Sequence, residues 1–521
     1  MQKKITINSI LGGQSVTEYF SADDSYLASI AIDPDMPVGS SVKASGCLVP
    51  VVYEEFSGAN ITGYPKWLIT NIKDALVYAY MSDGKVVSYN SSLASETLLT
   101  TPTSGAGNGA DYYKNYLYFA TPTDVARYGP LNGSPSLTQT VWTGATLGSQ
   151  VALANTTYPT IGGVSIPNHP MHSHADGALY FADVINGAGV LHKIKTTKVT
   201  VEGDTNDTSV YNALDLPQGW FITDIDSWGL DVAILAIQTS SSSIDQGKSA
   251  LFLWDPTNTL TFYRGPIYLP DPLATSLANA NGRLYIWSGN AVAGVRLSEY
   301  IGGDSVSEIA FLEDGLPPLA GCCDVNGSRI VWGQTVSIPE TAVSVMSYGS
   351  KNSRLPKSIH NIARATSASG LCTALKYVQQ GSSVQKLVIG SGTGSAYALD
   401  KFSTTSAYDS IWRSKMFTVG SRFTIDRIRI PLGVALAANM SLVVKLVYDD
   451  GSATKILTTI NTTNFTAGTR KIIFDQQSIL DNSITPQNNF FIELSWGGSV
   501  KLPIIFPLEI IIDIQSDESN D

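Results

Sequence analysis

The chain has 521 residues and a formal net charge of −11, with 15% charged and 43% hydrophobic residues. This negative charge argues against a nucleic-acid binder that works through a broad basic surface. No apolar run approaches the roughly 18 residues that a membrane helix needs, and MQKKITINSILGG at the start lacks the apolar stretch of a signal peptide. We therefore expect a soluble protein made in the cytoplasm, with no membrane partner and no sequence-specific nucleic-acid partner.

Residues 1–45 do not have the pattern of a packed domain. Gly12-Gly13 and the proline-containing run 33–37 flank an apolar patch at Tyr26–Ile32, which has no partner in its own neighbourhood. Exposed apolar patches of this kind mark interaction sites. We expect an extended N-terminal arm that reaches beyond its own domain and locks the protein into a homo-oligomeric ring. The alternative is a strand that folds back into the chain's own propeller.

Residues 46–405 repeat one imperfect unit, which consists of a turn followed by two short strands. The clearest copy is Asp176–Ile194 (DGALYFADVINGAGVLHKI), in which apolar and polar residues alternate with the period of half-buried strands. Related units begin at Lys73, Asn115, Asn281, Asn326 and Leu387. Repetition at about 40 to 50 residues suits the blades of a β-propeller. We predict a propeller of six or seven blades over residues 46–405.

The pattern changes near Ser410, where the strands become longer and alternate more strongly. Leu442, Val444 and Leu446 share one strand face, and Leu508, Ile510 and Ile512 share another. This pattern predicts an antiparallel β-sandwich over residues 410–515. Residues 516–521 form an acidic tail, which we expect to be disordered. The predicted fold class is therefore all-β, with a β-propeller followed by a C-terminal sandwich.

The strongest candidate for a chemical site is a histidine cluster. Three of the five histidines, His169, His172 and His174, fall within six residues, and imidazole is a common ligand of transition metals. On a strand, His172 and His174 would project from the same face and could share a metal. No HExxH or CxxC motif and no carboxylate cluster accompanies them. We therefore predict no metal and no cofactor, and we interpret the three histidines as a loop cluster near the propeller axis or rim.

Other candidate groups carry weaker signals. Asp224 and Asp226 would lie on one strand face, but a chain with 44 acidic residues is expected to contain such pairs by chance. The sequence contains no GxSxG or Walker motif in a supporting context, so we predict no catalytic residues. The four cysteines, Cys47, Cys322, Cys323 and Cys372, are too few for a disulfide framework in so long a chain, and we expect buried free thiols.

The order of parts resembles structural proteins of tailed-bacteriophage virions. The resemblance rests on the N-terminal segment ITINSILGG, on degenerate propeller repeats that are low in charge, and on the closing sandwich. The phrase 411–430, IWRSKMFTVG followed by RFTIDRIRI, looks like the segment of phage tail and tail-nozzle propeller proteins in which a strand leaves the propeller. Such proteins assemble into rings or tubes and contact the connector or the tail tube.

This resemblance implies a non-enzymatic structural component of a virion, at the tail or the head–tail junction. Its partners would be copies of itself and neighbouring tail or connector proteins, and it would be assembled in the host cytoplasm. Two alternatives remain open. One is a propeller that binds a host glycan or receptor, with Trp287 and Trp332 stacking on sugars. The other is a propeller enzyme that acts on polysaccharide through residues gathered from several blades.

Overall fold

The structure is a computed structural model that describes most of the chain. The described residues are 2–15, 25–36, 47–56, 58–71, 76–90, 92–102, 107–138, 153–154, 157–195, 208–240, 243–257, 263–290, 294–337, 339–351, 357–367, 370–380, 384–393, 396–404, 406–407, 409–419, 423–448, 454–475 and 489–514. Their secondary structure is β-strand. The predicted acidic tail, 516–521, lies outside the described residues.

The chain divides into two compact units. One contains residues 55–336 and 365–401, and the other contains residues 1–54, 337–364 and 402–521. The predicted domain boundaries differ from this division, because residues 46–54, 337–364 and 402–405 were assigned to the propeller. Alternation along the sequence marks strands, but it does not show which distant segment each strand packs against.

Four-stranded antiparallel sheets, each with its strands in chain order, make up most of the first unit. Five of them are complete within it: β5 (Pro65–Asn71), β6 (Leu76–Met81), β7 (Val86–Tyr89), β8 (Glu96–Thr100); β9 (Gly109–Tyr113), β10 (Tyr116–Ala120), β11 (Val125–Gly129), β12 (Ser136–Thr138); β15 (Met171–Ser173), β16 (Leu179–Ile185), β17 (Ala188–Lys195), β18 (Thr208–Asp215); β19 (Trp220–Trp228), β20 (Asp231–Ser240), β21 (Ser243–Trp254), β22 (Tyr263–Tyr268); and β23 (Leu273–Ala280), β24 (Arg283–Gly289), β25 (Val295–Tyr300), β26 (Ser307–Leu312).

Further strands of this unit follow the same order. They are the pair β27 (Cys323–Asn326) and β28 (Arg329–Val336), the group β31 (Leu371–Gln380), β32 (Val384–Thr393) and β33 (Ala396–Ser403), and a small hairpin of β13 (Thr160–Ile161) and β14 (Val164–Ser165).

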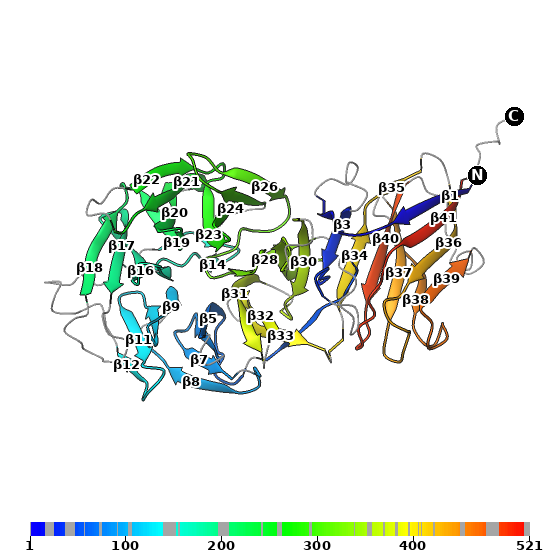
Figure 1. Ribbon diagram of the computed structural model, residues 1–521, viewed down its shortest axis with the longest axis horizontal. Helices are drawn as coiled ribbons and strands as arrows, with labels where there is room; N and C mark the ends of the chain where they lie inside the picture. The colour runs from blue at the N-terminus through cyan, green and yellow to red at the C-terminus, as the bar shows by residue number, and fades with distance from the viewer. Residues whose placement is uncertain are drawn as a thin grey trace. The chain divides into compact units, whose positions relative to one another are not determined.

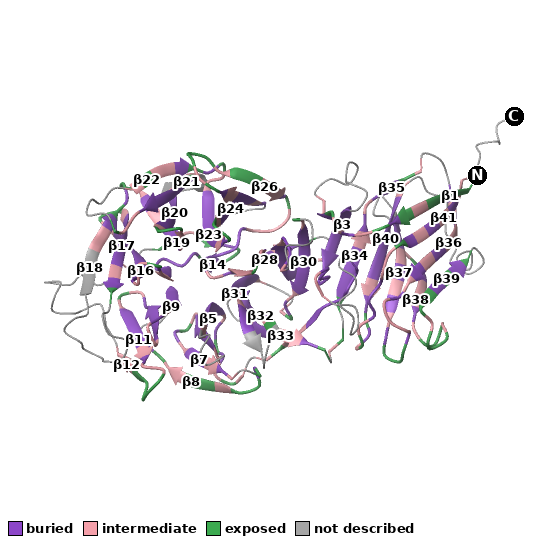
Figure 2. Ribbon diagram, in the orientation of Figure 1, coloured by how far each residue is buried: buried purple, intermediate pink, exposed green. Residues whose placement is uncertain are grey.

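The first strand of each group lies on the inside of a ring (Figure 1). Contacts join β5 to β9, β9 to β15, β15 to β19, β19 to β23, β23 to β27, β27 to β31, and β31 back to β5, so the ring is closed. At five of the seven junctions, the neighbouring sheets pack face to face around a hydrophobic cluster of their own. Most residues of the innermost strands β5, β9, β19, β23 and β31 are buried, whereas the outer strands β8, β12, β22 and β26 carry exposed residues (Figure 2). Sheets arranged in this way form a β-propeller.

The repeated unit that the sequence suggested corresponds to the second and third strands of a sheet. In the clearest copy, β16 and β17 pair antiparallel from Leu179 with Ile194 to Ile185 with Ala188. Their connection is Asn186-Gly187, and both residues have positive φ, at 52° and 76°. A two-residue Asn-Gly turn of this kind matches the twist of the strands it joins, so the local sequence sets the register of this hairpin.

The second unit contains two larger sheets. One has the order β1-β41-β36-β39: β1 (Gln2–Ile7), β41 (Leu508–Ile514), β36 (Phe423–Pro431) and β39 (Lys471–Asp475). The other has the order β2-β3-β34-β40-β37-β38, and β35 pairs with β40: β2 (Gly13–Gln14), β3 (Ser25–Ile30), β34 (Ser410–Ser414), β40 (Asn489–Trp496), β37 (Leu442–Tyr448), β38 (Thr454–Ile460) and β35 (Phe417–Thr418). Both sheets contribute to one hydrophobic core. The unit also holds β4 (Val52–Glu55) and the antiparallel pair of β29 (Ala342–Tyr348) and β30 (Ile359–Arg364).

The described part of residues 1–45, which the sequence suggested as an arm reaching beyond its own domain, pairs with strands of the chain's own second unit. β1 pairs with β41 from Gln2 opposite Asp513 to Ile7 opposite Leu508, and β3 pairs with β34. Ile7, Ile10 and Tyr26 are buried in the core that the two sheets share. The apolar residues lacked a partner only in their local sequence, because the strands they pair with, β41 and β34, lie several hundred residues later in the chain. The homo-oligomeric ring, which was inferred from the arm, remains a prediction without this support.

Within the described residues, no helix has both the length and the apolar character needed to cross a membrane.

The burial of the N-terminal segment gives a stability prediction. Ile10 is 0% exposed in the core of the second unit, so Ile10→Ala should lower the free energy of unfolding by about 2–5 kcal/mol through lost burial and a residual cavity. Ile473→Ala is the matched control, because Ile473 on the edge strand β39 is 48% exposed, and its loss should stay within about 0.5 kcal/mol. Urea unfolding measures both. Equal losses for the two variants would contradict the N-terminal packing.

Candidate functional site

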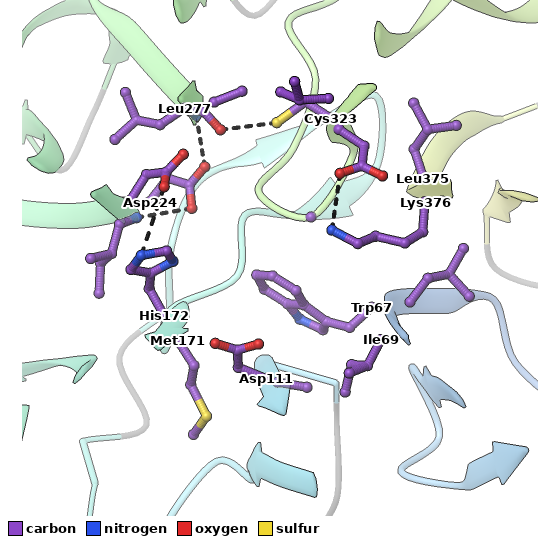
Figure 3. A pocket seen from close by; sticks show the side chains of 18 of the residues that line it. Trp67, Ile69, Asp111, Met171, His172, Asp224, Leu277, Cys323, Leu375 and Lys376 are labelled. Atoms are coloured by element: carbon purple, nitrogen blue, oxygen red, sulfur yellow. Dashed lines mark hydrogen bonds and ion pairs between the residues drawn. The ribbon is translucent and has the colours of Figure 1, made fainter. Parts of the chain in front are cut away.

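The innermost strands enclose a cavity of about 420 Å³ at the centre of the propeller unit. Residues of all seven strands β5, β9, β15, β19, β23, β27 and β31 line it. Figure 3 shows His172, Asp224, Cys323, Lys376 and Trp67 around the cavity, each from a different strand. A cavity of this size falls in the range that binds small molecules, so it is the candidate functional site.

The cavity wall is rich in carboxylates because the innermost strands have an unpaired edge. Each innermost strand pairs only with the second strand of its own sheet, so about half of its backbone N–H groups have no ladder partner. Buried N–H groups require an acceptor. Aspartate side chains on the adjacent innermost strand provide it at three of the junctions.

Two of these aspartates lie on β19 and bridge to β23. The Leu277 amide donates to Oδ2 of Asp224 at 2.7 Å, while Oδ1 of the same carboxyl group accepts from the next amide in its own chain, at 2.9 Å. The Asn279 amide donates to Oδ2 of Asp226 at 2.7 Å. The prediction that Asp224 and Asp226 share one strand face is confirmed, because both reach the same neighbouring strand.

The same arrangement recurs at two other junctions. On β9, Oδ2 of Asp111 accepts from the Ser173 amide of β15 at 2.6 Å. On β27, Oδ2 of Asp324 accepts from the Tyr377 amide of β31 at 2.6 Å, and its Oδ1 accepts from Lys376 Nζ at 3.0 Å. The four aspartates therefore hold neighbouring sheets together by accepting hydrogen bonds across the junctions.

Asp224 has a strongly raised pKa. Burial raises its pKa to about 8, although the amides of Leu277 and Ile225 favour the charged form. Asp226 lies two residues away on the same strand, so the two carboxyl groups face the same way. Glycoside hydrolysis needs carboxyl groups that flank the bond from opposite sides, and this pair does not provide that geometry.

The structure brings two of the three clustered histidines together. His172 Nε2 lies 2.7 Å and His174 Nδ1 lies 2.8 Å from the hydroxyl oxygen of Ser227. The other nitrogen of His174, Nε2, lies 3.0 Å from the Leu230 carbonyl oxygen. A carbonyl only accepts, so His174 donates from Nε2 and accepts from the Ser227 hydroxyl at Nδ1. His172 then donates to Ser227. The hydroxyl occupies the point on which the two imidazoles converge.

His169 lies in a different environment. It is 0% exposed, and its Nδ1 donates to the Ala182 carbonyl at 2.9 Å. Burial lowers its pKa, and the nearby Asp183 only partly opposes this effect. Asp183 is also 3.3 Å from Nε2 of the buried His192. Among the described residues, no group of three or more His, Cys, Asp or Glu side chains is arranged to hold a metal ion.

The cysteines and tryptophans singled out in the sequence have structural environments. The four cysteines are free thiols, as predicted. Cys47, Cys322 and Cys372 are buried, whereas Cys323 is partly exposed. Cys323 lines the cavity and donates to the Leu277 carbonyl at 3.0 Å. Trp287 and Trp332 are each 0% exposed, with ring centroids 5.7 Å apart. Buried rings of this kind pack the core and do not present a face to a sugar.

Sequence reasoning missed Asp111, Asp324 and Lys376 in the cavity wall. A signal was available, because the strand that lines the axis comes just before the turn of each repeated unit. Asp111 precedes the turn at Asn115, and Asp324 precedes the turn at Asn326-Gly327. Aligning the units on their turns would have placed these residues at comparable positions.

Comparison with known proteins adds little. No protein-family model and no curated protein sequence matches the chain. Among solved structures, the chain is similar to the crystal structure of the Myceliophteria thermophila Cps50 (Swd1) β-propeller domain. The identity is 8% and the TM-score 0.41, over 67% of this chain and 100% of that domain. We draw no inference from so distant a likeness, and the propeller assignment rests on the ring of sheets.

The pKa of Asp224 predicts how stability depends on pH. Its pKa rises from 3.8 to about 8 on folding, so between these values the folded protein keeps a proton that the unfolded chain releases. The free energy of unfolding of the native protein, measured relative to Asp224→Asn, should therefore fall as pH rises through this window. Urea unfolding of both proteins across the window tests this. A difference that does not change with pH would contradict it, and carbon NMR titration of Asp224 in the native protein provides an independent readout.

The histidine geometry predicts metal content. His172 and His174 direct ring nitrogens at the Ser227 hydroxyl, so a metal would have to displace that hydroxyl, and His169 is engaged elsewhere. We expect elemental analysis of tag-free protein to find less than stoichiometric zinc or nickel. Stoichiometric metal that is lost in a His172→Ala, His174→Ala double variant would refute this prediction.

Proposed function

We propose that this chain is a non-enzymatic structural component of a tailed-bacteriophage virion, at the tail or the head–tail junction. It would assemble with copies of itself and with neighbouring tail or connector proteins, in the host cytoplasm. The proposal assumes a fold of a seven-bladed propeller followed by a β-sandwich. The phage-like phrase at 411–430 stands at the start of that sandwich.

The observation that carries the proposal is the use of the cavity carboxylates. All four aspartates of the wall accept hydrogen bonds from backbone amides of the neighbouring innermost strand. Each of these carboxyl groups thus satisfies a backbone amide of the neighbouring strand, which gives it a structural role. The four aspartates of the cavity wall are therefore best explained as groups that join neighbouring sheets, which favours a structural role.

The phage-like phrase supports the virion assignment by its place in the fold. Its residues form β34, β35 and β36, and these strands belong to two different sheets, since β34 pairs with β40 and β36 pairs with β41. The phrase therefore contributes strands to both sheets of the second unit. The glycan-binding alternative loses its proposed stacking residues, because Trp287 and Trp332 are buried.

Purified particles of the phage whose genome encodes this chain would test the proposal. Quantitative mass spectrometry of density-purified virions should find the chain at several copies per particle, and antibody labelling should locate it at the tail or the head–tail junction. The major capsid protein serves as the internal standard. Absence from purified virions, with presence only in the lysate, would overturn the proposal.

A further inference from the structure

The second unit contains a cleft of about 280 Å³ along strand β1. One wall is β1 itself with the following residue, lined from Lys3 to Asn8. The opposite wall comes from the other sheet, through Trp412 and Ser414 of β34 and the 415–418 segment. The cleft therefore opens between the two sheets at the end where β1 is the outermost strand.

Within the described residues, β1 is an edge strand of its sheet. Among the described strands, β1 has only β41 as a neighbour. In an antiparallel pair, alternate residues direct their N–H and C=O groups away from the partner strand. Edges of this type accept a further strand from another chain, and main-chain hydrogen bonds then supply affinity.

The side chains around the cleft favour an acidic occupant. Lys3, Lys4 and Lys415 all line it, and Lys4 is held at the sheet surface by an ion pair with Glu509 at 2.5 Å. Lysines on an edge strand oppose the addition of a further strand unless that strand offsets their charge. They attract a segment that carries carboxylates, since opposite charges raise both the rate and the selectivity of encounter.

A second observation points to a missing polar partner. Trp412 lines the cleft and is 0% exposed, yet its indole Nε1–H has no hydrogen-bond acceptor among the described residues. A buried donor without an acceptor costs about 1–3 kcal/mol. A carbonyl or carboxylate oxygen that enters the cleft would supply this acceptor.

We infer that the free edge of β1 binds an extended, acidic segment of a partner protein. The segment adds to the sheet as a further strand beside β1, and its carboxylates face Lys3 and Lys415. An oxygen of the segment accepts from Trp412 Nε1. This inference does not depend on the virion assignment, because it concerns only the cleft and its charge.

Fluorescence anisotropy with a labelled peptide of alternating aspartate and valine tests the inference. The folded full-length protein should bind this peptide, and binding should weaken as salt rises because the contacts are ionic. The same peptide with lysine in place of aspartate should not bind. A backbone N-methylated aspartate–valine peptide should also fail, because it cannot form the strand ladder.

Matched protein variants locate the site. Lys3→Glu combined with Lys415→Glu should weaken binding by about tenfold or more through charge reversal. Lys471→Glu should leave it unchanged, because Lys471 begins β39 at the opposite edge of the same sheet. Thermal melting of each variant checks its fold. If the double variant fails to fold, the two control peptides on the native protein still decide the matter.

Three outcomes would overturn the inference. The first is equal binding of the N-methylated and unmodified peptides, which would show charge attraction without strand addition. The second is binding of a peptide of residues 515–521 in preference to the aspartate–valine peptide, which would assign the cleft to a second copy of this chain. The third is tighter binding of a single-stranded oligonucleotide that the Lys3, Lys415 double reversal abolishes.

Discussion

The unpaired edge of the innermost strands is the constraint on which the propeller unit depends. A ring of sheets leaves one backbone edge of each innermost strand facing its neighbour, and buried amides there need acceptors. Asp111, Asp224, Asp226 and Asp324 supply them from the adjacent strand. Threonine hydroxyls add a second set of bridges, since Thr223 donates to the Ala274 carbonyl at 2.7 Å and Thr275 donates to the Pro318 carbonyl at 2.6 Å. The junctions are therefore held by polar contacts near the axis and by apolar clusters further out.

These bridges explain why aspartates line the centre of the propeller. The register of β19 against β20 shifts between Ile222 and Asp224, and that of β23 against β24 shifts between Ala274 and Ser276. A bulge re-aims the residues around it, and here Thr223 and Thr275 occupy the bulges. The price is the burial of Asp224, whose pKa rises to about 8. Lys66, at the corresponding bulge of β5, is buried as well, and its pKa falls to about 8.

The sequence predicted the second and third strands of the sheets, but it did not identify the ring of innermost strands or the partners of the N-terminal strands. β16 and β17 alternate regularly and are joined by Asn186-Gly187, so local pattern and turn chemistry suffice to find them. The innermost strands carry bulges and buried polar residues, which break the alternation that marks a strand. β1 could not be placed because its pairing of Ile7 with Leu508 joins the two ends of the chain, and local pattern carries no information on such a distant partner. For the site, the sequence placed Asp224 and Asp226 on one face and brought His172 near His174, but it could not reveal that Ser227 fills the point between them.

Each sheet of the second unit carries a carboxylate held between two basic side chains on neighbouring strands. Glu493 of β40 accepts from Arg413 Nη2 at 2.6 Å and from Lys445 Nζ at 2.8 Å. Burial alone would raise its pKa, but these two partners outweigh burial and hold the pKa below its usual value. In the other sheet, Glu509 of β41 lies between Arg429 and Lys4 in the same way. The two charge clusters differ in exposure. Glu493 is buried in the middle of its sheet. The cluster of Glu509 includes Lys4, which lies on an exposed edge strand where an ion pair adds little stability. The edge strand β1 is therefore held mainly by its backbone ladder and by Ile7, and its lysine-rich outer side is left to determine which segment pairs with it.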